Sequence, residues 1–168
     1  SVWHHRPDGY ACYVCRYENK RNALAIWRGY LAQKGIDRDP AECNRIQLSG
    51  LGSSTALLPH ALEVIEKLSR THKLYIVTNA VASVQRSRLA NSALAPYITA
   101  AFISEEAGAA KPSRAYFDYV FSHIDGIAAD NCLVIGDSLS SDIKGANNAG
   151  LPCCWYNLKN EPRPDDLT

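Results

Sequence analysis

The sequence predicts an α/β protein, a three-layer Rossmann-like fold built on a parallel sheet. From about residue 57 onward, short apolar runs alternate with amphipathic runs, and each apolar run is followed by a polar residue. Strands that are apolar on both faces are typical of parallel sheets covered by helices. The 168 residues suit one ordinary domain, and 46% hydrophobic with 21% charged residues excludes disordered, collagen-like and coiled-coil chains.

The part of the chain before this alternation predicts two helices. Apolar residues at helical spacing predict a helix that starts near Lys20 and ends at Gly35. Its apolar members are Ala23, Ile26, Trp27, Tyr30 and Leu31. Asp39-Pro40 is typical of the cap and first turn of a second short helix, predicted through about Gln47. The glycine- and serine-rich residues 48–54 predict a flexible link.

The rest of the chain predicts four buried strands and the helices between them. The strands are predicted at 74–78, 100–104, 132–136 and 151–156. Helices are predicted from Pro59 with Leu62, Ile65 and Leu68 facing inward, over 81–94, from Pro112 through Ile124, and from Ser140 to Ala149. Gly150 is predicted to end the last helix, because glycine accepts a left-handed backbone.

Charge and composition limit the classes of partner that the protein is expected to bind. Eighteen Lys and Arg face 17 Asp and Glu, so a formal charge of +1 gives no bulk case for a nucleic acid polymer or an anionic membrane. No apolar run reaches the length of about 20 residues that a membrane helix needs. Cys132, Cys153 and Cys154 lie in apolar runs as small hydrophobic residues, which favours a reducing, cytoplasmic location. The oligomeric state stays open.

Polar residues gather where a parallel sheet places its active site, beyond the carboxyl ends of strands. Thr78 and Asn79 follow one predicted strand, Asp137 and Asp142 follow another, and Lys111 stands at a predicted helix start. Thr78 and the next amide can donate to phosphate oxygens, and a lysine at a helix start adds to its positive end. The two carboxylates offer oxygen ligands to Mg²⁺, which neutralises charge on a transferring phosphoryl group.

Each feature also has a plain structural interpretation. Asn79 can cap a strand end, Lys111 can be a solvated side chain before a helix, and Asp137 and Asp142 can be a helix cap and a first-turn carboxylate. These interpretations are the common ones for each residue taken alone. All three features, however, occur together at strand or helix ends in one succession, and this favours a phosphate site.

The stretch from LYIVTN at 74–79 to SDIKGANNAG at 141–150 resembles the haloacid dehalogenase (HAD) superfamily of phosphohydrolases. Thr78 matches the Ser/Thr of its motif II, Lys111 the lysine of motif III, and GDSLSSD the GDxxxxD of motif IV. SRLANSALAPY, FISEEAGAAKP and CWYN look like the pyrimidine 5′-nucleotidase-like subgroup. The resemblance implies a remnant helical cap at 19–56 and a Rossmann-like core at 57–158, between an atypical segment 1–18 and a tail 159–168.

The resemblance also implies residue roles. Lys111, Thr78 and Asp137 would be catalytic, with Thr78, Asn79 and Lys111 holding the phosphoryl group. Mg²⁺ would be bound by Asp137, with Asp142 supporting the metal or its waters. In the family, an aspartate of motif I attacks the phosphoryl group, and a second aspartate two residues later serves as general acid and base.

Motif I, a hydrophobic strand ending in DxDx[TV], is not found in this sequence. The DxD at Asp37-Arg38-Asp39 follows the end of a predicted helix and precedes Pro40, so we do not expect it to carry the nucleophile. The motif I strand is central in the family's sheet, and without it two half-sheets are expected. The strand-like residues 10–17 are a candidate replacement. Alternatively the sequence is incomplete upstream of Ser1, which fits its lack of Met.

A second possible site lies near the start of the chain. His4, His5, Cys12 and Cys15 contain a CxxC and could assemble a zinc site. No second CxxC or HxxxH follows, so a free dithiol or incidental cysteines are the favoured interpretation.

The sequence therefore predicts a Mg²⁺-dependent phosphomonoester hydrolase, acting on a small phosphorylated metabolite, most simply a nucleoside 5′-monophosphate, in a chain without the nucleophile motif. One alternative is a catalytically inactive phosphate- or nucleotide-binding protein. The other is a sugar-phosphate or phosphoglycolate phosphatase.

Overall fold

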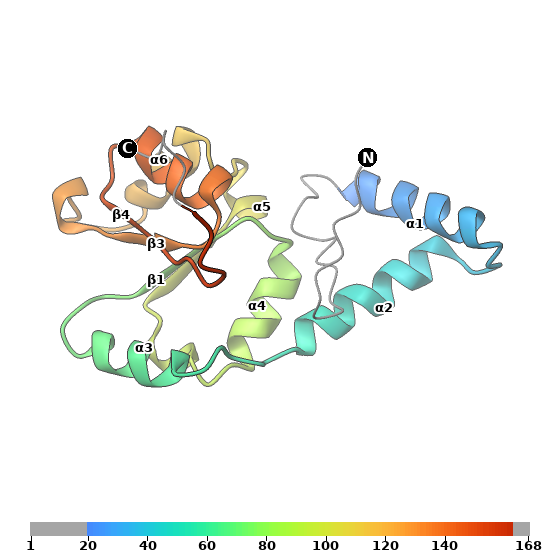
Figure 1. Cartoon of the computed structure of the whole chain (residues 1–168), viewed down its shortest axis with the longest axis horizontal. Coiled ribbons are helices and arrows are strands. Elements are labelled where there is room, and N and C mark those ends of the chain that lie inside the picture. The colour runs from blue at the N-terminus through green and yellow to red at the C-terminus, as the bar shows by residue number, and fades with distance from the viewer. Residues whose placement is uncertain (1–19, 163–168) are drawn as a thin grey trace. The chain divides into compact units, whose positions relative to one another are not determined.

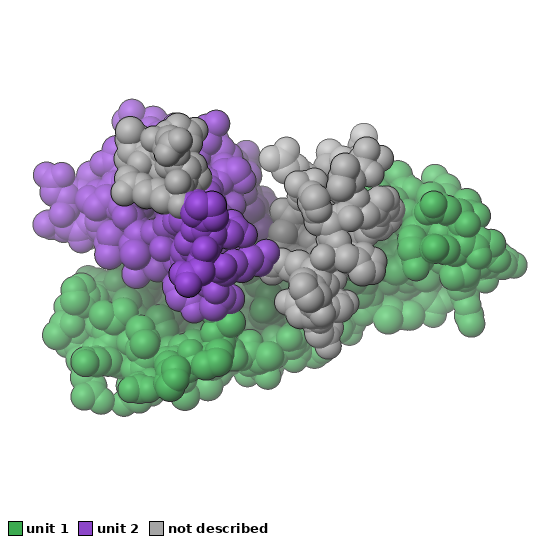
Figure 2. Space-filling view, in the orientation of Figure 1, with its two compact units in different colours: residues 1–75, 80–100 green, residues 76–79, 101–168 purple. Residues whose placement is uncertain are grey.

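A computed structural model describes residues 20–162, which fall into two compact units (Figures 1 and 2). Within that range the first unit holds residues 20–75 and 80–100, and the second holds 76–79 and 101–162. The candidate strand 10–17, the histidine and cysteine cluster and the end of the tail lie outside the described residues. No helix in the described range is long and apolar enough to cross a membrane.

The first unit begins with a pair of helices that pack against each other, α1 (Lys20–Lys34) and α2 (Pro40–Ser53) (Figure 1). The predicted first helix is confirmed. Asp39 caps α2, since its Oδ1 accepts from the amide of Ala41 at 2.9 Å. The two helices are also joined by side chains, because Trp27 Nε1 donates to Gln47 Oε1 at 3.1 Å.

The prediction of a flexible link at 48–54 is wrong, because α2 continues through Ser53. Gly52 is buried against α4 (Ala82–Ala90), where an added Cβ would lie 3.4 Å from the Ser87 side chain. Ser87 Oγ in turn donates to the Gly52 carbonyl at 3.0 Å. Packing against a second helix thus outweighs the low helix propensity of glycine.

Two further helix predictions need correction. Helix α3 (Ala61–Ser69) exists, but Leu62 is exposed rather than facing inward. Helix α4 ends at Ala90, short of the predicted residue 94, because Ser92 Oγ accepts from the amide of Leu94 at 3.2 Å and draws the backbone out of the helix. A short 3₁₀ turn, η2 (Ala95–Tyr97), follows.

The strands confirm all four predicted positions, each in shorter form. The prediction that all four are buried is wrong for β3 and β4, because Ile135 and Cys154 are exposed. They are β1 (Tyr75–Thr78), β2 (Ala100–Ile103), β3 (Val134–Gly136) and β4 (Cys153–Trp155). Among the described residues they form two two-stranded sheets, β1 with β2 and β3 with β4. The second pair is parallel, with Val134 opposite Cys153. The described residues thus contain two strand pairs, and the prediction of a strand at 10–17 that replaces the central one lies outside the described residues.

Helices complete the second unit. They are α5 (Ser104–Ala107), which was not predicted, α6 (Arg114–Ser122), the 3₁₀ turn η3 (Ala129–Asn131), the π-helical turn η4 (Leu139–Ile143) and α7 (Lys144–Ala149). The core is built on Ile103, Tyr116, Phe117 and Ile143. Gly145 lets α7 approach α6, since an added Cβ would lie 3.0 Å from Phe117 and 3.2 Å from Pro112. Gly150 ends α7 at φ 72°, as predicted.

Candidate active site

Lys111 is a buried residue held by two acceptors. Its Nζ donates to the Val77 carbonyl at 2.7 Å and to Asp142 Oδ1 at 2.6 Å. The side chain is only 7% exposed, so the interpretation of Lys111 as a solvated residue is wrong. An ammonium has three donors, and the third has no partner among the residues that the structure describes. Lys111 can therefore offer one N–H and its charge to an anion.

The sequence placed Lys111 at the start of a helix, and the structure corrects this position. The helix begins at Arg114, after the N-cap residue Ser113, three residues beyond Lys111. The ammonium points instead to the end of β1 and to Asp142. The two hydrogen-bond partners of the ammonium are therefore one carbonyl and one carboxylate.

Asn79 holds the backbone of Lys111. Its Nδ2 donates to the Lys111 carbonyl at 2.8 Å, and its Oδ1 accepts from the Lys111 amide at 2.9 Å. One side chain thus imitates a pair of sheet hydrogen bonds and joins the end of β1 to the segment before α6. The role of Asn79 at the phosphoryl group stays a prediction. Its contact with Lys111 could not be seen in the sequence, because the residues are 32 positions apart.

Tyr116 is a site residue that the sequence analysis missed. Its side chain is fully buried, and its hydroxyl accepts from the Thr78 amide at 2.9 Å and donates to the Phe102 carbonyl at 2.7 Å. Burial raises the pKa of Tyr116 well above its ordinary value, so the phenol keeps its proton. The available signal was its spacing four residues before Val120, which places it on the buried face of α6.

Asp142 and Asp137 follow β3 and differ in their surroundings. Asp142 is buried, with Oδ1 on Lys111 and Oδ2 accepting from the Ser138 amide at 3.0 Å. Asp137 is exposed, and its carboxylate has no hydrogen bond or ion pair with any residue in the described part of the chain. Ser138, and not Asp137, caps the following turn, with Oγ accepting from the Ser141 amide at 3.3 Å.

Gly136 explains how Asp142 reaches back over the end of β3. A Cβ at this position would lie 2.6 Å from Asp142 Oδ2, which is closer than real Cβ contacts come. Only glycine therefore leaves room for the Asp142 carboxylate beside the strand. The first residue of the GDxxxxD motif thus has a steric role in placing its last residue.

Of the two carboxylates that follow β3, that of Asp137 is the one without a partner in the described part of the chain, so a magnesium ion here would have few protein ligands. No group of three or more His, Cys, Asp or Glu side chains that could hold a metal ion occurs in the described range. Mg²⁺ commonly takes one or two carboxylates and completes its shell with water and substrate phosphate. The uncommitted Asp137 carboxylate suits a direct ligand, while both Asp142 oxygens already accept hydrogen bonds. These ligand roles remain predictions.

The DxD of the first unit has a different role. Asp37 and Asp39 are exposed between α1 and α2, and Asp39 is the N-cap of α2. This placement agrees with the expectation that the pair carries no nucleophile.

Most of the chain matches a known protein family. Residues 16–150 match the family described as haloacid dehalogenase-like hydrolase, which is most of the chain. This chain is a haloacid dehalogenase-like hydrolase. The resemblance inferred from Thr78, Lys111 and the GDSLSSD motif is therefore confirmed at the level of the family.

Relatives of this HAD-like hydrolase include named nucleotidases. The HAD-hydrolase YfnB of Bacillus subtilis is 38% identical over 137 residues, covering 82% of this chain and 58% of YfnB. The pyrimidine 5′-nucleotidase PynA of Streptococcus pneumoniae is 41% identical over 54% of this chain and 38% of its own length. The pyrimidine 5′-nucleotidase YjjG of Escherichia coli is 31% identical over 79% of this chain and 59% of its own length. The chain thus spans less than two thirds of each.

The fold agrees with these sequence matches. A crystal structure of YfnB bound to magnesium superposes with a TM-score of 0.81 at 34% identity, covering 91% of this chain and 67% of that one. The α/β, HAD-like fold class predicted from the sequence is thereby confirmed.

Replacing Asn79 by alanine tests its contact with Lys111. We expect the free energy of unfolding to fall by about 2 kcal/mol, because two partly buried hydrogen bonds are lost at about 1 kcal/mol each. Asn148→Ala is the control, since its amide makes one exposed bond to the Pro112 carbonyl at 2.9 Å. Urea denaturation measures both, and equal small losses would show that Asn79 does not hold the Lys111 backbone.

Proposed function

We propose that this HAD-like hydrolase binds phosphate monoesters and hydrolyses them, with nucleoside 5′-monophosphates as the substrate class. The observation that carries the proposal is the buried Lys111 ammonium, fixed by Val77 and Asp142 with one donor left for an anion. A fixed cation in a poorly solvated position stabilises phosphoryl charge more strongly than a solvated one. The names of two relatives, both pyrimidine 5′-nucleotidases, support the nucleotide class.

The other residues receive roles from their positions. Thr78 and Asn79 lie at the end of β1 beside the Val77 carbonyl that holds Lys111, and would bind phosphoryl oxygens. Asp137 would hold Mg²⁺ with support from Asp142, and the bound ion would neutralise charge on the phosphoryl group. Lys111 contributes a second positive charge. Catalytic roles are therefore proposed for Lys111, Thr78 and Asp137.

A phosphate- or nucleotide-binding protein without turnover is the second candidate. This candidate is favoured because the DxD at Asp37 and Asp39 is not placed as a nucleophile motif. Asp39 caps α2, and the pair follows a helix rather than a strand. The first candidate requires a nucleophile that no described residue supplies by this motif.

An activity assay distinguishes the two candidates. For a phosphatase, turnover of dUMP is expected in the presence of Mg²⁺. Asp137→Ala should abolish this turnover, and Asp125→Ala, which removes an exposed carboxylate on a loop, should leave it unchanged. A sugar phosphate and p-nitrophenyl phosphate complete the substrate panel. Phosphate-induced thermal stabilisation without turnover would support the binding protein. If the chain shows neither turnover nor stabilisation, both candidates are refuted.

A further inference from the structure

The peptide bond between Val77 and Thr78 is held at both ends. Its carbonyl accepts from Lys111 Nζ at 2.7 Å, and its N–H donates to the Tyr116 hydroxyl at 2.9 Å. The C=O and N–H of a planar trans peptide point in opposite directions. Lys111 and Tyr116 therefore bind opposite edges of one rigid peptide plane. A rotation of this plane moves the Val77 carbonyl, which is the acceptor of Lys111.

The hydrogen bonds continue beyond both residues. Tyr116 donates to the Phe102 carbonyl at 2.7 Å, which joins the chain of bonds to β2. Lys111 donates to Asp142 Oδ1 at 2.6 Å, which joins it to the turn after β3. Linked hydrogen bonds in a poorly solvated interior strengthen one another. The Lys111 ammonium is thus one member of a connected series that includes the Tyr116 hydroxyl.

We propose that Tyr116 is a positioning residue of the anion site, whose hydroxyl fixes the Val77–Thr78 peptide and thereby the direction of the remaining Lys111 N–H. The inference rests on the proposed function in taking phosphate as the ligand.

Packing alone does not explain a tyrosine at this position. Burying a hydroxyl costs free energy that only hydrogen bonds recover, and Phe117 beside it is buried without one. Because burial keeps the phenol protonated, its hydrogen is committed to Phe102 and its oxygen can only accept from Thr78. The sense of the hydrogen bonds at this peptide is therefore fixed.

Phosphate titration of the full chain tests this role. Tyr116→Phe removes the hydroxyl and keeps the ring, and we expect inorganic phosphate to bind about five- to tenfold more weakly, the size of one hydrogen bond. Tyr119→Phe is the matched control on the same helix, because its ring packs on Phe102 and His123 while its hydroxyl has no hydrogen bond among the described residues. Its affinity is expected to stay unchanged.

A second readout does not depend on phosphate binding. The side-chain ¹⁵N resonance of Lys111 is expected to shift in Tyr116→Phe and not in Tyr119→Phe. If Tyr116→Phe does not fold, 3-fluorotyrosine at position 116 keeps the shape and alters the hydroxyl, and the same resonance is expected to shift.

The outcomes separate the two proposals. A wild-type chain that neither binds phosphate nor turns over dUMP would refute the proposed function, while the Lys111 resonance would still decide the role of Tyr116. An unchanged Lys111 resonance together with unchanged phosphate affinity, where binding is present, would overturn the positioning role.

Discussion

Replacing Lys111 by methionine is expected to lower the free energy of unfolding by about 3 to 5 kcal/mol, the cost of breaking a buried ion pair from one side. The Lys111 and Asp142 side chains are 7% and 12% exposed, so water does not screen or replace the lost contact. The Asp142 carboxylate would stay buried without its cation, and the Val77 carbonyl would lose its donor. Urea denaturation followed by circular dichroism measures the loss.

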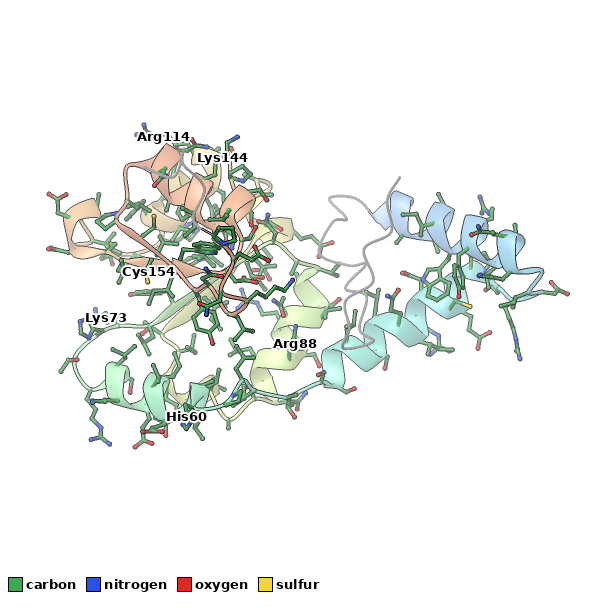
Figure 3. All side chains as sticks on the ribbon, viewed as in Figure 1. His60, Lys73, Arg88, Arg114, Lys144 and Cys154 are labelled. Atoms are coloured by element: carbon green, nitrogen blue, oxygen red, sulfur yellow. The ribbon has the colours of Figure 1, made fainter. Side chains whose placement is uncertain are left out.

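Two comparisons make this result specific. Lys144→Met removes an exposed lysine of α7 that projects from the surface (Figure 3), and is expected to cost less than about 0.5 kcal/mol. Lys111→Met combined with Asp142→Leu removes both charges and is expected to recover part of the loss, because no unpaired charge remains. Equal costs for the two lysine variants would contradict a buried ion pair.

Replacing Gly136 by alanine is expected to cost about 2 to 3 kcal/mol through overpacking. The new Cβ would lie 2.6 Å from Asp142 Oδ2, so the carboxylate must move away from the end of β3. That movement takes Oδ1 off Lys111 and Oδ2 off the Ser138 amide. Denaturant titration gives the loss, and phosphate titration at low temperature shows whether the anion site is lost with it.

Gly50→Ala is the matched control for Gly136→Ala. Gly50 lies within α2, and among the described residues an added Cβ would meet no atom outside the backbone of its own helix within 4 Å. Alanine there should stabilise the helix by about 0.5 to 1 kcal/mol, because it restricts the unfolded chain. If Gly136→Ala changes the free energy of unfolding by no more than Gly50→Ala does, Asp142 accommodates the methyl group.

The parts of the fold that were predictable follow from local patterns. Solid apolar runs located all four strands, Asp39-Pro40 located the start of α2, and Gly150 located the end of α7. The end of α2 was not predictable, because it depends on a contact between Gly52 and Ser87, which are 35 positions apart. Local propensity is a weak guide where another element packs on the backbone.

The candidate site was likewise predictable in part. Motif order predicted that Lys111, Asp142 and the end of β1 lie together, and the hydrogen bonds of Lys111 to Val77 and Asp142 join these three elements. What each side chain contacts could not be predicted. Asn79 holds a backbone, Tyr116 joins two strands, and Lys111 is buried rather than solvated, and each depends on partners distant in sequence.

The second unit is discontinuous in sequence, and this sets the order in which its site can assemble during synthesis. Residues 76–79 emerge first, and residues 80–100 of the other unit must follow before the rest of the second unit begins. Lys111, the partner of Asn79, is synthesised 32 positions after it, and Asp142, the partner of Lys111, follows a further 31 positions later. Closing such loops costs entropy that only the finished contacts repay. A fragment starting after residue 100 would therefore lack the Val77 carbonyl and the Asn79 amide that fix the lysine.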